Sequence, residues 1–202
     1  MTLEYGMIAF ILGLAGFVLF FVYDINSYTR RSRALRPCFA LGAALIAVFA
    51  GMELLSARKA GAFSGVGDML LLLLGLASLA LLIYCLFFAL PFSETYLNAP
   101  ENRHVYDSGA YALCRHPGVL CFFAVFLFWG LAALPSAFLA KGMALSAINA
   151  AYAWFQDRVT FPKTFSDYPE YRDRVPFLIP TKNSLRSAFR MRSRAGGKRK
   201  KK

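Results

Sequence analysis

Two apolar stretches in the second half of the chain decide the fold. Residues 118–134 read GVLCFFAVFLFWGLAAL, residues 137–155 read AFLAKGMALSAINAAYAWF, and only Pro135 and Ser136 separate them. Together they are about twice as long as the ~20 apolar residues that one helical crossing of a bilayer needs. A proline at the junction cannot continue the backbone hydrogen bonds of a single helix. The pattern therefore predicts two membrane-spanning helices joined as a tight hairpin.

Three further apolar stretches lie upstream, at residues 5–23, 37–55 and 69–92. The chain has 202 residues, of which 58% are hydrophobic, and its mean hydropathy is +0.49. A soluble domain of this size needs far less apolar sequence for one core. We expect an all-α, polytopic membrane protein with about five transmembrane helices in one domain, residues 1–180, and a short cytosolic C-terminal region. The N-terminus lacks the features of a cleaved signal peptide, so the first stretch should remain as a helix.

Basic residues in the loops predict the orientation in the membrane. The formal net charge is +12, and ten of the basic residues lie in the last segment, 181–202, which contains no acidic residue. Four arginines lie between the first two apolar stretches: Arg30, Arg31, Arg33 and Arg36. Since lysine and arginine are enriched in cytoplasmic loops, the N-terminus should lie outside and the C-terminus in the cytoplasm.

The basic tail, residues 181–202, most resembles a segment that binds anionic lipid headgroups, and we do not expect nucleic acid as its partner. Within it, residues 183–194 have apolar side chains at helical spacing among arginines, which predicts a helix lying in the membrane interface. Beyond Ala195 the composition predicts disorder. The four cysteines form no CxxC pair, so we expect neither a disulfide framework nor a metal site.

Polar residues flank the predicted hairpin at its open end. Arg115, His116 and Pro117 precede the fourth apolar stretch, and Asp157 and Arg158 follow the fifth. Since packed helices lie roughly 8–10 Å apart, Arg115, His116 and Asp157 can meet beside a helix N-terminus, which favours anions. The alternative is structural: an interfacial arginine, a capping histidine, a first-turn proline and a solvated Asp–Arg pair.

The order of these features resembles the isoprenylcysteine carboxyl methyltransferase and phospholipid N-methyltransferase superfamily. The resemblance is carried by GAYALCRHP at 109–117, the apolar hairpin, and FSDYPEYRDRVPFLIP at 165–180. It covers roughly residues 93–180, and Asp157 takes the place of the first glutamate of a family pair. Outside this region the first two spans match only as apolar helices.

The resemblance implies an integral membrane enzyme that uses S-adenosylmethionine at the cytosolic face, in a bacterial plasma membrane. The acceptor would be a lipid or a lipid-linked group, of the isoprenylcysteine carboxylate or phospholipid amine type. Such a site needs positioning rather than a covalent nucleophile, and no catalytic residue is singled out. The residues implied in cofactor binding are Tyr111, Arg115, His116, Asp157, Tyr168 and Tyr171.

The chain also departs from the family pattern, which leaves two alternatives open. Val119 stands for a tyrosine, Cys121 for a glycine, Ala153 for an arginine and Arg158 for the second glutamate. One alternative is a nicotinamide-dependent membrane reductase of the sterol-reductase type. The other is a non-catalytic membrane scaffold whose basic tail binds lipid.

Aromatic residues of the fourth apolar stretch also allow two interpretations. They can line a tunnel for a lipid substrate, or they can be ordinary packing and lipid-facing residues. The residues concerned are Phe122, Phe123, Phe126, Phe128 and Trp129.

Overall fold

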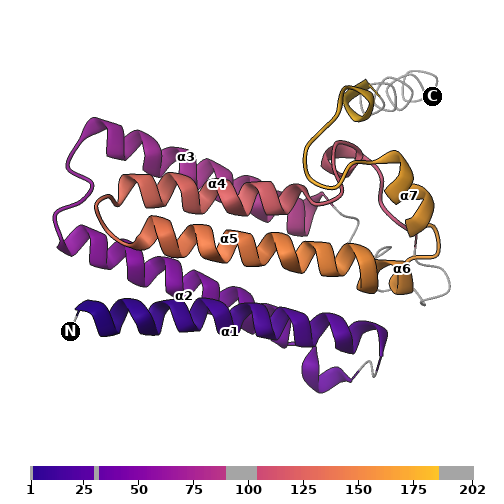
Figure 1. The fold of residues 1–202 in the computed structure, drawn as a ribbon, viewed down its shortest axis with the longest axis horizontal. Coiled ribbons are helices and arrows are strands. Elements are labelled where there is room, and N and C mark those ends of the chain that lie inside the picture. The colour runs from indigo at the N-terminus through magenta and orange to yellow at the C-terminus, as the bar shows by residue number, and fades with distance from the viewer. Residues whose placement is uncertain (1, 30–31, 90–103, 187–202) are drawn as a thin grey trace, which may run out of the picture.

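The computed structural model describes residues 2–29, 32–89 and 104–186, and the regular structure within them is entirely helical (Figure 1). The all-α class is thus confirmed for this part of the chain. Five long helices form a bundle, and two short ones, α6 and α7, follow. Their bounds are α1 (Thr2–Tyr28), α2 (Cys38–Lys59), α3 (Val66–Ile83), α4 (Pro117–Ala132), α5 (Phe138–Phe155), α6 (Phe161–Thr164) and α7 (Tyr168–Arg174).

Short helical turns of other types extend or connect these helices. The 3-10 turns are η1 (Arg33–Leu35) and η5 (Gly109–Ala112). Two wider π-helical turns continue long helices: η2 (Tyr84–Phe88) follows α3, and η6 (Gln156–Thr160) follows α5. π-Helical turns are rare and are found frequently at functional sites.

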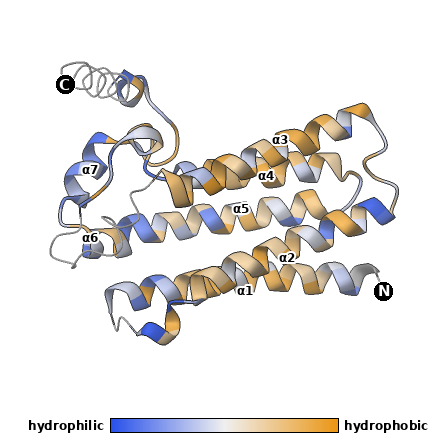
Figure 2. Ribbon diagram, turned by 180° about the vertical axis from the view of Figure 1, so that it is seen from behind, coloured by the Kyte–Doolittle hydropathy of each residue, from blue (hydrophilic) through white to orange (hydrophobic). Residues whose placement is uncertain are grey.

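Within the described residues, three helical segments are long and apolar enough to cross a membrane: Glu4–Tyr28, Arg33–Lys59 and Val66–Phe88. Helix α4 is apolar but has only 16 residues, which gives it a length of about 24 Å. Helix α5 has 18 residues and includes Lys141. Hydrophobic residues cover most of the long helices, while hydrophilic residues gather at the ends of the bundle, among them α7 and the α1–α2 connection (Figure 2). These features are those of an integral membrane protein, and the count of five spans stays a prediction.

The predicted hairpin is present. Helices α4 and α5 run side by side, joined by residues 133–137 (Figure 1). Glycines allow their close approach: a Cβ atom on Gly130 would lie 2.7 Å from the Leu139 Cα, and one on Gly142 would lie 2.9 Å from the Phe126 Cβ. Larger residues at these two positions would push the helices apart, so the glycines set the spacing of the hairpin.

Aromatic side chains from four helices form the core. The ring of Phe49 in α2 lies 6.5 Å from Phe10, 5.7 Å from Phe126 and 5.8 Å from Phe138, measured between centroids. Trp129 in α4 is also buried and donates its indole N–H to a carbonyl of α3. Phe122, Phe126 and Trp129 therefore serve as packing residues of the core, while Phe123 is exposed.

The two ends of the bundle differ. The α1–α2 connection, η5, α6 and α7 lie at one end, and the N-terminus, the α2–α3 connection and the α4–α5 turn lie at the other (Figure 1). This is the grouping that the basic-residue pattern predicts, although which end faces the cytoplasm stays a prediction. At the N-terminal end, Lys141 and the buried Glu53 form an ion pair of 2.6 Å between α5 and α2.

Parts of three predictions lie outside the described residues. These are the last residues of the predicted span 69–92, the first residues of the region 93–180 that carries the family resemblance, and the tail beyond residue 186. Of the predicted interfacial helix, residues 183–186 are helical, and the rest lies outside the described part.

Candidate functional site

The start of α4 is held against the segment that follows α7. Pro117 is the first residue of α4, and His116 occupies the N-cap position, as expected for a proline that needs no backbone donor there. The Arg115 amide donates to the Pro176 carbonyl at 2.9 Å, and the His116 amide donates to the Phe177 carbonyl at 3.2 Å. These two hydrogen bonds hold the Arg-His-Pro stretch against the end of the FSDYPEYRDRVPFLIP stretch.

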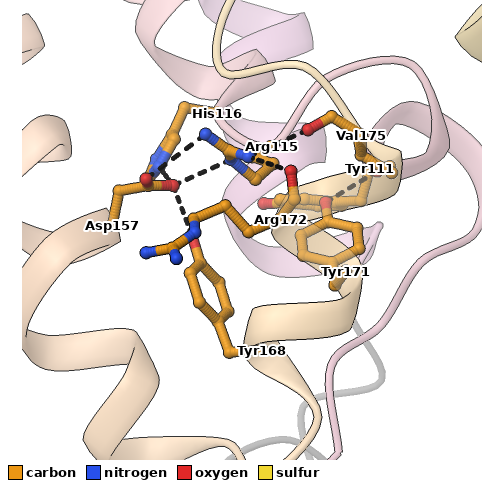
Figure 3. Close-up of polar contacts among 8 residues, drawn as sticks. All are labelled: Tyr111, Arg115, His116, Asp157, Tyr168, Tyr171, Arg172 and Val175. Carbon is orange, nitrogen blue, oxygen red and sulfur yellow. Dashed lines mark hydrogen bonds and ion pairs between the residues drawn. The ribbon is translucent and has the colours of Figure 1, made fainter.

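Arg115 joins three parts of the chain (Figure 3). Its Nη1 donates to the carbonyls of Arg172 at 2.6 Å and Val175 at 3.0 Å. Its Nη2 donates to the Asp157 Oδ2 at 3.3 Å, and its Nε lies 2.8 Å from Oδ1. The Nε contact lacks hydrogen-bond geometry, so it counts as charge attraction. Arg115 thereby fixes the carboxyl end of α7 to Asp157.

Asp157 lies in the wide turn η6 and is only 1% exposed. Besides Arg115, it receives a hydrogen bond from the Tyr168 hydroxyl to Oδ1 at 2.6 Å. Burial alone raises the pKa of the Asp157 carboxyl, but the His116 and Tyr168 contacts and the Arg115 charge outweigh it, and the net pKa is lowered. Asp157 is therefore a buried, ionised carboxylate. The alternative in which Asp157 and Arg158 form a solvated pair is wrong for Asp157.

His116 completes the cluster from the other side. Its ring stacks on Phe161 at 5.7 Å and meets Phe177 edge-on at 5.0 Å. Its Nε2 lies 3.5 Å from the Asp157 Oδ1 and has no hydrogen-bond partner among the described residues. Burial, aided by the Arg115 charge and opposed by Asp157, lowers the pKa of His116. The result is a neutral imidazole whose buried Nε2 contacts Asp157 without hydrogen-bond geometry.

The other two predicted tyrosines, Tyr111 and Tyr171, donate their hydroxyl groups to backbone carbonyls. The Tyr171 hydroxyl donates to the Tyr111 carbonyl at 2.7 Å, and the Tyr111 hydroxyl donates to the Cys85 carbonyl at 3.0 Å. Burial raises the pKa values of Tyr168 and Tyr171, so both remain protonated donors. Four of the six predicted residues contact one another around Asp157: Arg115, His116, Asp157 and Tyr168. Tyr111 and Tyr171 connect the surrounding loop to η2 and α7.

Several residues of the site are not singled out by the sequence pattern. Phe161 and Phe177 enclose His116, and the buried Thr160 Oγ1 has no hydrogen-bond partner within the described ranges. Phe161 lies four residues after Asp157, which would place it on the same face of a regular α-helix, but the wide turn η6 between them breaks that spacing. Phe177 belongs to an irregular segment, where no such spacing applies.

The cluster contains hydrogen-bonding groups of the kinds that the cofactor implied by the resemblance needs. S-adenosylmethionine carries a carboxylate, an ammonium group and hydroxyls, and its binding needs both donors and acceptors in a dry site. The His116 Nε2 and the Thr160 Oγ1 are buried and unpartnered among the described residues, and the Asp157 carboxylate has further lone pairs. Much of the Arg115 guanidinium, by contrast, is already committed to backbone carbonyls and Asp157.

The chain matches no described protein family, no curated protein and no solved structure. A function is therefore inferred from the residues of this cluster and from the sequence resemblance of residues 93–180.

Proposed function

We propose that this protein is an integral membrane methyltransferase that uses S-adenosylmethionine to methylate a lipid or lipid-linked acceptor. The observation that carries the proposal is the His116 Nε2, which is buried 3.5 Å from the ionised Asp157 and forms no well-aligned hydrogen bond within the described residues. Leaving a buried polar atom without a partner is costly, and a bound ligand would remove that cost.

The roles follow from the contacts. His116 and Asp157 would bind the cofactor, which supplies an electrophilic methyl group when bound. Arg115 would act through Asp157 and through the α7 carbonyls, holding the acid in place rather than contacting the ligand. Transfer of a methyl group depends mainly on holding donor and acceptor close and aligned, which a rigid cluster of this kind favours.

A lipid-borne acceptor is supported by the surroundings of the cluster. The Tyr111 hydroxyl bonds to Cys85 in η2, and neighbouring η2 side chains are exposed, with Phe88 at 73%. This turn belongs to a segment apolar enough to cross a membrane. An acceptor carried by a lipid would therefore reach the cluster along the helix surface without leaving the bilayer.

Isothermal titration of the purified protein in nanodiscs tests the proposal. We expect saturable binding of S-adenosylmethionine and S-adenosylhomocysteine, and none of NADPH. His116→Asn should weaken the binding by about 1–3 kcal/mol, the cost of losing a buried hydrogen-bond partner. His104→Asn is the matched control, because His104 is 71% exposed, and it should bind as the wild type does.

Two results would overturn the proposal. If the wild-type protein binds neither S-adenosylmethionine nor S-adenosylhomocysteine, the proposed methyltransferase activity is excluded. Saturable binding of NADPH instead would replace it with the reductase alternative.

A further inference from the structure

A second buried polar network lies next to the first. Asp24, in the last two turns of α1, is 7% exposed. Its Oδ2 accepts hydrogen bonds from the Tyr152 hydroxyl at 2.6 Å and from the Gln156 Nε2 at 2.8 Å. A carboxylate in an apolar helix is expensive to bury without such partners, so its retention calls for an explanation.

The place of Gln156 in the chain supplies one. Gln156 opens the wide turn η6, and the next residue is Asp157. The backbone of this turn closes with the Phe161 amide donating to the Gln156 carbonyl, a five-residue spacing that is rare in proteins. Gln156 is thus held by α1, while Asp157 is held by Arg115 from the start of α4. The turn is fixed from two sides by side chains.

Helix α1 makes further contacts with the same segment. The rings of Phe21 and Phe155 lie 4.7 Å apart, and the Lys163 ammonium lies 4.7 Å from the centroid of the Tyr28 ring. The end of α1 therefore contacts the chain before, within and after η6. Among these contacts, the hydrogen bonds to Asp24 depend most strongly on direction.

We propose that Asp24, through Tyr152 and Gln156, is a positioning residue that sets the η6 turn so that Asp157 faces Arg115 and His116. Its part in cofactor binding rests on the function proposed above, whereas its effect on the geometry of the cluster does not. Both hydrogen bonds end on the same oxygen, Oδ2, so one correctly placed oxygen is enough. The negative charge of Asp24 is not required.

This distinction defines the test. Asp24→Asn keeps an oxygen at this position and should behave as the wild type, while Asp24→Leu removes it. Tyr152→Phe removes one of the two bonds to Asp24, together with the hydroxyl's contact to the Phe20 carbonyl at 3.2 Å, and should give an intermediate effect. Glu53→Gln is the control for loss of a buried polar contact elsewhere, because its ion pair with Lys141 lies at the opposite end of the bundle.

The first readout is the imidazole NMR signal of His116. The chain has two histidines, so in a His104→Gln background the remaining signal belongs to His116. We expect Asp24→Leu to shift this signal at temperatures where the protein is fully folded, and Asp24→Asn and Glu53→Gln to leave it in place. A general loss of stability would not produce this pattern.

The second readout is the dissociation constant of S-adenosylhomocysteine. Misplacing a binding group by a small distance has large effects, so Asp24→Leu should raise the constant about tenfold or more, and Asp24→Asn should not change it. An unshifted His116 signal in both Asp24→Leu and Tyr152→Phe overturns the positioning role. Equal shifts in Asp24→Asn and Asp24→Leu also overturn it, because the charge would then be responsible. Absence of any wild-type binding overturns the proposed function alone, and the NMR signal still decides the positioning role.

Discussion

Replacing Arg115 by alanine should destabilise the protein strongly and locally. The change removes two hydrogen bonds to carbonyls at the end of α7 and the charge that faces Asp157. The Arg115 side chain is 10% exposed and that of Asp157 is 2% exposed. Water cannot replace the lost partner at such depth, so Asp157 would remain as an uncompensated buried charge.

The magnitude follows from this burial. Breaking a buried ion pair by removing one partner costs about 3–5 kcal/mol, most of it from the stranded charge. Removing the stranded charge as well should recover much of the loss, because apolar replacements of a buried pair are often nearly neutral. Arg115→Met with Asp157→Leu should therefore be more stable than Arg115→Ala, despite carrying one more substitution.

Thermal unfolding and hydrogen exchange in nanodiscs would measure both effects. We expect a lower unfolding midpoint for Arg115→Ala and faster exchange of the amides in α7. Arg174→Ala is the control, since Arg174 reaches Asp107 only at 3.5 Å and is 58% exposed; such surface pairs contribute about 0–1 kcal/mol. A loss below about 1 kcal/mol for Arg115→Ala, or a double variant less stable than the single one, would refute the reasoning.

His116, Gly75 and the C-terminus each allow a separate test. Since the folded-state pKa of His116 is lowered, its contribution to stability is present above pH ~6.5 and lost on acidification below it; thermal midpoints from pH 8 to 5 should fall less in His116→Gln. Gly75→Ala should cost about 1–3 kcal/mol, because a Cβ there would overlap the Trp129 indole, whereas Gly51→Ala meets open space and should cost nothing in urea unfolding. A reporter fused after Lys202 should signal from the cytoplasm, and a signal from outside would contradict the predicted orientation.

The sequence predicts the hairpin and the meeting of Arg115, His116 and Asp157 because both depend on distance along the chain. Two apolar stretches with almost no loop between them must pack side by side, and their free ends must then meet. Such reasoning does not predict the contacts of Asp24. Asp24 lies near the end of the first span, and its partners Tyr152 and Gln156 follow more than a hundred residues later. Only the packing of α1 on α5 brings them together.

Backbone geometry sets the second limit. Helical periodicity assumes a constant turn, but η6 is wider than an α-turn, so the directions of Asp157 and the residues after it cannot be taken from a helical wheel. The carbonyl partners of Arg115 leave no trace in the sequence either, because every residue has a carbonyl. What the sequence lacks is therefore the path of the main chain through the site.

The carbonyl contacts of Arg115 also affect how the site can vary in evolution. Because the arginine binds main-chain oxygens of Arg172 and Val175, either residue can be exchanged without altering the atoms that the guanidinium recognises. Homologous chains with this arrangement should keep an arginine at 115 and an acid at 157, while positions 172 and 175 vary freely. Comparison of such chains would thus report only part of the contacts that hold this end of the protein together.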